Sequence, residues 1–94
     1  MMEERKAYEE RFAVQLKEWK VQLVQLKAKA EKTTAELKIK YYCIIEDLQN
    51  KYDTARAKLT ELKAAGDEKW EDIKTGAENA WDDVKTAFHV TAFK

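Results

Sequence analysis

Apolar residues in the first half of this 94-residue chain recur at alternating intervals of four and three residues. The line consists of Phe12, Leu16, Trp19, Leu23, Leu26, Ala30, Thr33 and Leu37. This spacing is typical of the seam of a left-handed coiled coil, where each apolar side chain faces a partner helix. The pattern therefore predicts a long amphipathic coiled-coil helix over residues 1–65.

A second line of apolar residues runs along the same segment. Val14, Val21, Ala28 and Ala35 follow one another at seven-residue spacing, nearly opposite the first line when residues advance by about 100°. A helix that is apolar on two sides suits a bundle better than an isolated two-stranded coil. Lone exposed apolar residues are also common on protein surfaces, so the valines are open to that interpretation too.

From Leu37 onward the spacing changes to an eleven-residue rhythm. Three segments that begin at Leu59, Trp70 and Trp81 align with one another, and the last two share the order Trp, acid, Asp, aliphatic, Lys, Thr. An eleven-residue period corresponds to about 3.67 residues per turn, so this part is expected to run nearly straight or weakly right-handed.

The stretch from Ala64 to Asp67 is the one place where the helix is expected to end. Gly66 suits the left-handed residue that closes a helix, and Asp67 suits the N-cap of the next one. The apolar rhythm nevertheless passes through Gly66 without a slip, as it would in a continuous helix. We expect a single all-α domain, with a bend or turn at Gly66 and a Trp-rich amphipathic helix over 66–94.

Composition supports helices that need partners. The chain has no Pro and two Gly, and 38% of its residues are charged. An extended helix of this size buries little surface by itself, and oligomerisation is the usual remedy. The residues expected at the helix–helix interface are Phe12, Leu16, Trp19, Leu23, Leu26, Leu37, Tyr41, Ile44, Leu48, Tyr52, Leu59, Leu62, Trp70, Ile73, Trp81, Val84 and Phe88.

The distribution of charge indicates how such helices pair. Eighteen basic and eighteen acidic residues cancel, which argues against nucleic acid as a partner. Residues 17–40 hold seven Lys against three Glu, whereas residues 67–83 hold seven acids against two Lys. An antiparallel pair centred near residue 47 would overlap these two blocks. The pattern predicts an antiparallel homo-oligomer, a dimer or a tetramer, or else a helical protein partner.

A hairpin within one chain is the alternative. It would fold at Gly66 and lay the acidic tail on residues 49–65, which hold four basic residues against two acids, a weaker match in charge. In the oligomer, the segment Tyr41–Ile45 is apolar all round the helix and is expected at the centre of a four-helix assembly. Cys43 is then a small buried residue; an intermolecular disulfide or a redox sensor is the other interpretation.

No catalytic constellation is present in the sequence. Neighbouring carboxylates such as Glu71 and Asp72 diverge around a helix, and there is no Ser or Gly-rich phosphate loop. His89 has no His, Cys or carboxylate at the spacing of a helical metal site. We expect no enzyme activity, no cofactor and no metal.

The tryptophans lie on the apolar stripe and are expected to anchor helix contacts. The alternative is insertion of the Trp70–Phe93 face into a membrane surface, although its polar side is acidic where membrane-binding helices are usually basic. No apolar run approaches the ~20 residues that span a bilayer, no secretory signal is visible, and there is one cysteine. These features predict a cytoplasmic location.

The segment from Ala65 to Phe88 resembles a family of small bacterial coiled-coil proteins with a Trp-containing C-terminal helical repeat. The resemblance implies a soluble bacterial protein without known enzymatic activity, and it carries over no catalytic residue. The expected function is that of a structural or scaffolding protein acting through helix contacts. The alternative is a stress-protectant or membrane-surface-binding amphipathic helix.

Overall fold

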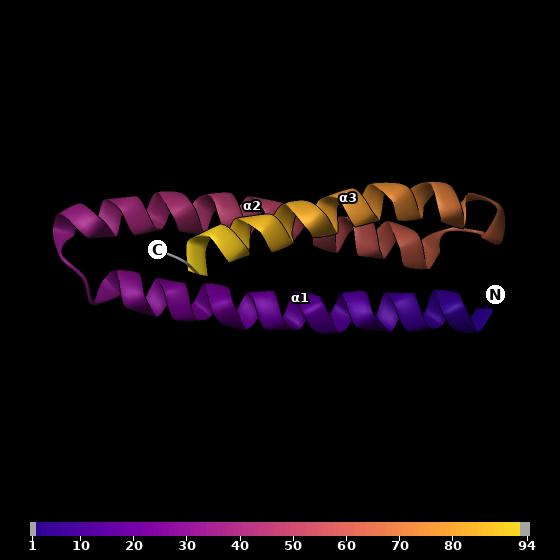
Figure 1. Cartoon of the computed structure of the whole chain (residues 1–94), viewed down its shortest axis with the longest axis horizontal. Helices are drawn as coiled ribbons and strands as arrows, with labels where there is room; N and C mark the ends of the chain where they lie inside the picture. Colours follow the sequence, from indigo (N-terminus) through magenta and orange to yellow (C-terminus); the bar gives the residue numbers. More distant parts are fainter. Residues whose placement is uncertain (1, 93–94) are drawn as a thin grey trace.

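The computed structural model describes residues 2–92, which form three helices joined by two short turns. The helices are α1 (Met2–Glu31), α2 (Ala35–Ala64) and α3 (Asp67–Ala92). Figure 1 shows that α2 returns antiparallel to α1, and that α3 folds back along both in the direction of α1. The molecule measures 51 × 21 × 17 Å. The described residues contain no strand, which confirms the all-α prediction.

The turn between α1 and α2 shows that the single helix expected over 1–65 is wrong. Thr34 has an extended backbone (φ −67°, ψ 159°), and its Oγ1 accepts a 3.4 Å hydrogen bond from the Leu37 amide. It is thus the N-cap of α2, a role for which threonine is well suited. Thr33 and Thr34 are β-branched, and their hydroxyl groups compete for backbone hydrogen bonds, so they are weak helix formers.

The turn between α2 and α3 lies where a break was expected, but its geometry differs. Ala65 is extended (φ −70°, ψ 140°), and the Gly66 carbonyl accepts hydrogen bonds from the amides of Lys69 (3.1 Å) and Trp70 (3.0 Å). Gly66 does not have a positive φ, so it is not the expected left-handed closing residue. Asp67 begins α3 instead of capping it, which places its carboxylate near the positive end of the helix dipole.

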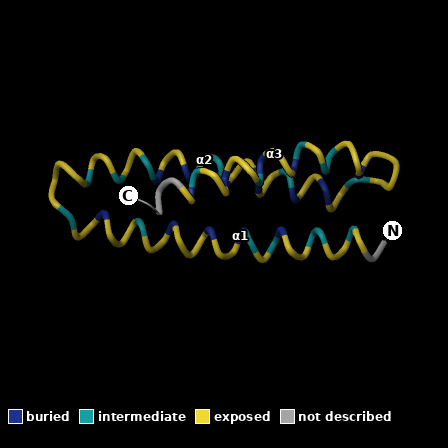
Figure 2. The backbone as a smooth tube through the Cα atoms, viewed as in Figure 1, coloured by how far each residue is buried: buried dark blue, intermediate teal, exposed yellow. Residues whose placement is uncertain are grey.

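One buried stripe on each helix builds the core, as the blue segments in Figure 2 show. The large side chains that are wholly buried are Phe12, Leu23, Leu48, Leu62 and Val84. Each such side chain contributes about 1.5–3 kcal/mol through removal from water. The helices therefore find their apolar partners within one chain, including the hairpin at Gly66 that the sequence offered as the alternative.

The third helix does not cover the whole hairpin formed by α1 and α2. Trp19 of α1 and Phe88 of α3 stack with their ring centroids 6.0 Å apart. Because α3 ends one turn after Phe88, at Ala92, it stops at about the level of Leu23 in α1. Beyond that level α1 and α2 continue to their turn as a pair, visible at the left of Figure 1. We call this part, residues 24–43, the distal end.

Candidate interaction surface

Aromatic side chains fill the space between α1 and α3. Phe12 packs edge-on against Trp81 at 4.6 Å between ring centroids, and Trp19 contacts the same indole at 5.8 Å. Tyr8 packs edge-on against Trp70 at 5.8 Å. Edge-to-face and stacked pairs each add about 0.5–1.5 kcal/mol to the burial of the rings. These tryptophans hold α3 against α1, so the apolar face on which they lie is occupied by contacts within the same chain.

Most residues expected at an interface between copies lie between helices of the same chain. Buried are Phe12, Leu16, Trp19, Leu23, Leu48, Tyr52, Leu59, Leu62, Trp70, Val84 and Phe88. Half-buried and packed against them are Leu26, Tyr41, Ile44, Ile73 and Trp81. The remaining one, Leu37, is 46% exposed. Nearly all of these residues are thus buried or half-buried within a single chain, and their role in self-association stays a prediction.

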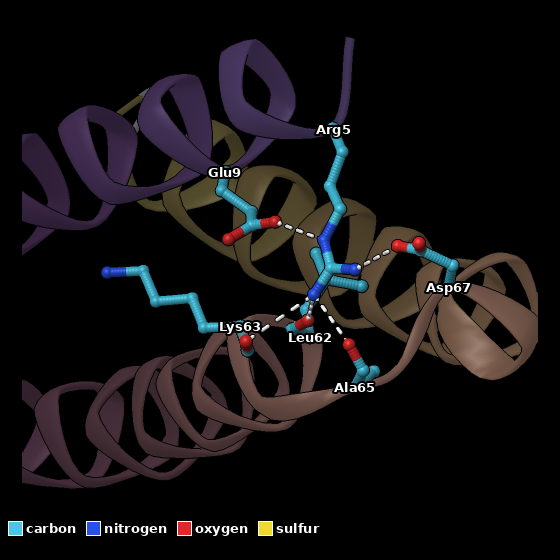
Figure 3. A network of polar contacts seen from close by, with 6 residues as sticks. All are labelled: Arg5, Glu9, Leu62, Lys63, Ala65 and Asp67. Carbon is cyan, nitrogen blue, oxygen red and sulfur yellow. Dashed lines mark hydrogen bonds and ion pairs between the residues drawn. The ribbon is translucent and has the colours of Figure 1, made fainter. Parts of the chain in front are cut away.

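Arg5 joins the start of α1 to the turn between α2 and α3 (Figure 3). Its Nη2 donates hydrogen bonds to the carbonyl oxygens of Leu62 (3.1 Å) and Ala65 (2.6 Å), and its Nη1 pairs with Asp67 at 3.0 Å. Glu9 accepts from Nε at 3.0 Å and orients the guanidinium. The carbonyls that end a helix lack partners within it, so a cation there supplies both hydrogen bonds and favourable charge. Sequence reasoning missed this contact.

Tyr8 borders a shallow cleft between α1 and α3 that Arg11, Val14 and Trp81 also line. Within the described residues its hydroxyl is buried without a hydrogen-bond partner. This burial, together with the negative charges of Glu78 and Asp82, raises the pKa of Tyr8 to about 12. The phenol therefore stays neutral near pH 7, and its role here is packing.

Cys43 lies on the surface, contrary to the expectation that Tyr41–Ile45 is enclosed on all sides. Its neighbour Tyr42 is 46% exposed, and Ile39 is 67% exposed. At this level the described part of α3 has ended and α2 packs against α1, so the side of α2 that faces away from α1 is left exposed. The apolar residues on the outer side of this segment therefore stay exposed in the single chain.

Exposed apolar side chains are concentrated at the distal end. The large hydrophobic residues that the structure leaves exposed are Val14, Val21, Val24, Leu37, Ile39 and Tyr42, and the last four of these belong to the distal end. None belongs to the described part of α3. An isolated exposed aliphatic residue is ordinary, but several gathered at one end of a small protein indicate an interaction site.

Leu37 is the most informative of these residues. It lies four residues before Tyr41 and seven before Ile44, so the three share the face of α2 that packs in the core. Opposite them on α1 is Leu26, since Arg5 of α1 reaches Leu62 of α2 and the helices run antiparallel. We call Leu26, Leu37, Tyr41 and Ile44 the distal strip. It continues the surface on which α3 lies, and the described part of α3 ends at about the level of Ile44.

The distal end is also basic. Residues 24–43 contain five lysines against Glu31 and Glu36. Lys29 follows Leu26 by three residues and Lys40 follows Leu37 by three, so each lies beside the distal strip on its own helix. Both lysines are exposed.

Across the described residues, no group of three His, Cys, Asp or Glu side chains lies close enough together to hold a metal ion. None of the described helices has the length and apolar character needed to cross a membrane.

Comparison with known proteins found one similarity. The model of a family described as the TMP repeat matches residues 70–80 and 81–89, which are two consecutive units within α3. The matches coincide with the repeats that begin at Trp70 and Trp81, and they confirm a Trp-containing helical repeat near the C-terminal end. No curated protein and no solved structure was found to match the chain.

Proposed function

We propose that this chain is a non-enzymatic interaction protein that binds a helix, from a second copy or from another protein, at its distal end. The observation that supports this function is the exposure of Leu37, 46%, on the same face of α2 as the buried core. A docked helix would cover it as α3 covers the equivalent face nearer Gly66. A cytoplasmic, bacterial protein with a scaffolding role remains part of the same proposal.

Burying the distal strip would give a bound helix its main contribution to affinity. Complete burial of a leucine side chain contributes about 1.5–3 kcal/mol, and Leu37 has the most of this still to gain, since Leu26, Tyr41 and Ile44 are already half-buried. Leu37, Tyr41 and Ile44 line one face of α2, on which the apolar anchors of an incoming amphipathic helix would rest.

The membrane-surface alternative has less support. Trp70 and Phe88 are buried against the other helices, so that face of α3 is available to lipid only if α3 opens. Phe93, the last residue of the expected face, lies outside the described residues.

The test measures association directly. Sedimentation of the folded protein is followed over a range of concentrations, alone and with synthetic amphipathic helices whose polar faces are acidic, uncharged or basic. We expect association with a copy or with at least one helix. Leu37→Glu should abolish it, while Val14→Glu, at a residue 56% exposed and distant from the distal end, should not. A protein that stays monomeric and binds none of the helices would rule the function out.

A further inference from the structure

The distal strip has features in common with the part of the α1–α2 hairpin that α3, an acidic helix, covers. The hairpin of α1 and α2 already carries one helix, α3, whose residues 67–83 include seven acids against Lys69 and Lys74. We propose that a second acidic amphipathic helix, from a protein other than this one, docks on the distal strip in line with α3. This proposal rests on the function proposed above and specifies the partner.

The contacts of α3 show how the hairpin accepts an acidic helix. Apolar residues of α3 enter the core, while Arg5 of α1 pairs with Asp67 at its start. From α2, the ammonium group of Lys58 lies within 3.9 Å of the position that a Cβ would take at Gly76. Within the described residues, the ion pair that joins the hairpin to an acid of α3 is that of Arg5 with Asp67, whereas Lys58 borders α3 while it pairs with Glu61 of its own helix at 3.6 Å.

The distal strip offers the same combination of groups. Leu37 and Ile44 supply the apolar face, and Lys29 of α1 and Lys40 of α2 adjoin it. Charges that flank an apolar helix contact select the partner by sign and speed its approach. Acidic residues on either side of the apolar face of an incoming helix would meet these two lysines.

A second copy of this chain fits the strip poorly. Two distal ends placed together would bring ten lysines and four glutamates into one contact, since each end holds five and two. Like charges that face each other oppose association. The acidic helix of a second copy is no better, because none of the exposed large hydrophobic residues belongs to the described part of α3. A folded copy therefore offers exposed apolar groups at its distal end, where the charge is positive. Its acidic helix, α3, offers negative charge but no exposed large apolar side chain in its described part.

An anionic lipid surface would also be attracted to the lysines, but the apolar groups favour a helix. The strip is built from residues of two helices, Leu26 of α1 and Leu37, Tyr41 and Ile44 of α2, as a site for a third helix would be. Membrane-surface helices present one continuous apolar side, whereas the other exposed apolar residues of the distal end, Val24, Ile39 and Tyr42, lie on different faces of their helices from the strip.

The probe is a 21-residue amphipathic peptide with leucine at the a and d positions of its heptads and glutamate at the flanking positions. Two twins carry glutamine or lysine at those positions. Binding to the whole chain is followed by fluorescence anisotropy of labelled peptide at low and high salt. We expect the glutamate peptide to bind about fivefold more tightly than the glutamine peptide at low salt, as two exposed charge pairs imply. The lysine peptide should bind more weakly than both.

Charge reversal provides the decisive variant. Lys29 and Lys40 are exposed, so Lys29→Glu/Lys40→Glu is expected to leave the helical circular dichroism unchanged while reversing the order of the glutamate and lysine peptides. Lys17→Glu/Lys20→Glu, the same change of charge outside the distal end, is the matched control and should keep the original order.

Several results would overturn the proposal. Equal binding of the three peptides, still lost in Leu37→Glu, would mean that the strip binds helices whatever their charge. The proposed function would then stand, and the inference that the partner is acidic would be wrong. A dimer that forms without peptide and is lost in Leu37→Glu would make a second copy the occupant. Capture by anionic vesicles, with no peptide bound, would assign the end to a lipid surface.

Discussion

The guanidinium of Arg5 lies against the end of α2, where its Nη2 donates a 2.6 Å hydrogen bond to the carbonyl oxygen of Ala65. The two residues are 60 positions apart in the chain. The contact therefore ties the start of α1 to the turn from which α3 begins, and it closes the end of the bundle opposite the distal end.

Replacing Arg5 with alanine should lower the free energy of unfolding by about 1–3 kcal/mol, the cost typical of losing hydrogen bonds to a charged group. Most of this loss should come from the carbonyls of Leu62 and Ala65, because Asp67 is 89% exposed and an exposed ion pair contributes little. Arg5→Lys should recover only part of it, since an ammonium group cannot donate in the same fork. Urea denaturation measures the change.

Arg56→Ala serves as the control for that experiment. Arg56 is an exposed arginine on α2, and its loss should change stability by less than about 0.5 kcal/mol. Equal losses in the two variants would show that the contacts of Arg5 do not stabilise the bundle.

The turn between α1 and α2 depends on the cap at Thr34. Thr34→Ala removes the acceptor for the Leu37 amide and should cost about 0.5–1 kcal/mol in thermal or urea unfolding. The lower part of the known range applies because the hydrogen bond is long, 3.4 Å. Thr33→Ala, which leaves the cap in place, should cost less; if it costs more, Thr34 is not the residue whose side chain caps α2.

That turn also shows the limit of reading the sequence. Thr33 falls in phase with Ala30 and Leu37, so the apolar line passes across the turn without interruption. A three-residue turn between antiparallel helices uses nearly as many residues as one helical turn of 3.6, and the phase cannot distinguish them. Two adjacent threonines followed by Glu36 were the available signal.

Periodicity identified which residues meet a partner helix but not which chain supplies it. The stripe from Phe12 to Phe88 was expected between copies, whereas contacts among α1, α2 and α3 bury most of it within one chain. The exposure of Leu37 depends on how α1, α2 and the described part of α3 are placed relative to one another, which no local pattern encodes. The contacts of Arg5 with the end of α2 could not be predicted from the sequence either, because they are made to backbone carbonyls, which every residue has.

Gly76 lies inside α3, and replacing it with alanine should stabilise the protein by about 0.5–1 kcal/mol. A Cβ at this position would meet only Lys58, at 3.9 Å, which is ordinary contact with a flexible side chain. The expected gain arises from the lower backbone entropy of the unfolded chain. Differential scanning calorimetry would detect the higher Tm, and a lower Tm would mean that α3 and α2 are packed more closely here than the structure shows.

Tyr8 should make the stability of the bundle fall at high pH. Its pKa is raised from 10.0 to about 12 in the folded protein, chiefly by burial, so above pH 10 the unfolded chain releases this proton more readily than the folded one. The unfolded state then binds fewer protons, and linkage requires the free energy of unfolding to decrease as pH rises from about 10 to 12. Below pH 10 the phenol is neutral in both states and this dependence disappears.

Tyr8→Phe isolates the effect. At pH 7 the variant should be as stable as the parent or more stable by about 1 kcal/mol, because the hydroxyl that is removed is buried without a hydrogen bond in the described structure. Between pH 10 and 12 its advantage should grow, since phenylalanine has no proton to lose. Urea denaturation of both proteins at pH 7, 9, 10.5 and 11.5 gives the comparison, and Tyr42→Phe, at an exposed tyrosine, controls for the general effect of alkali. A difference between parent and Tyr8→Phe that stays constant across this range would mean that the Tyr8 hydroxyl is accessible to water in the folded bundle.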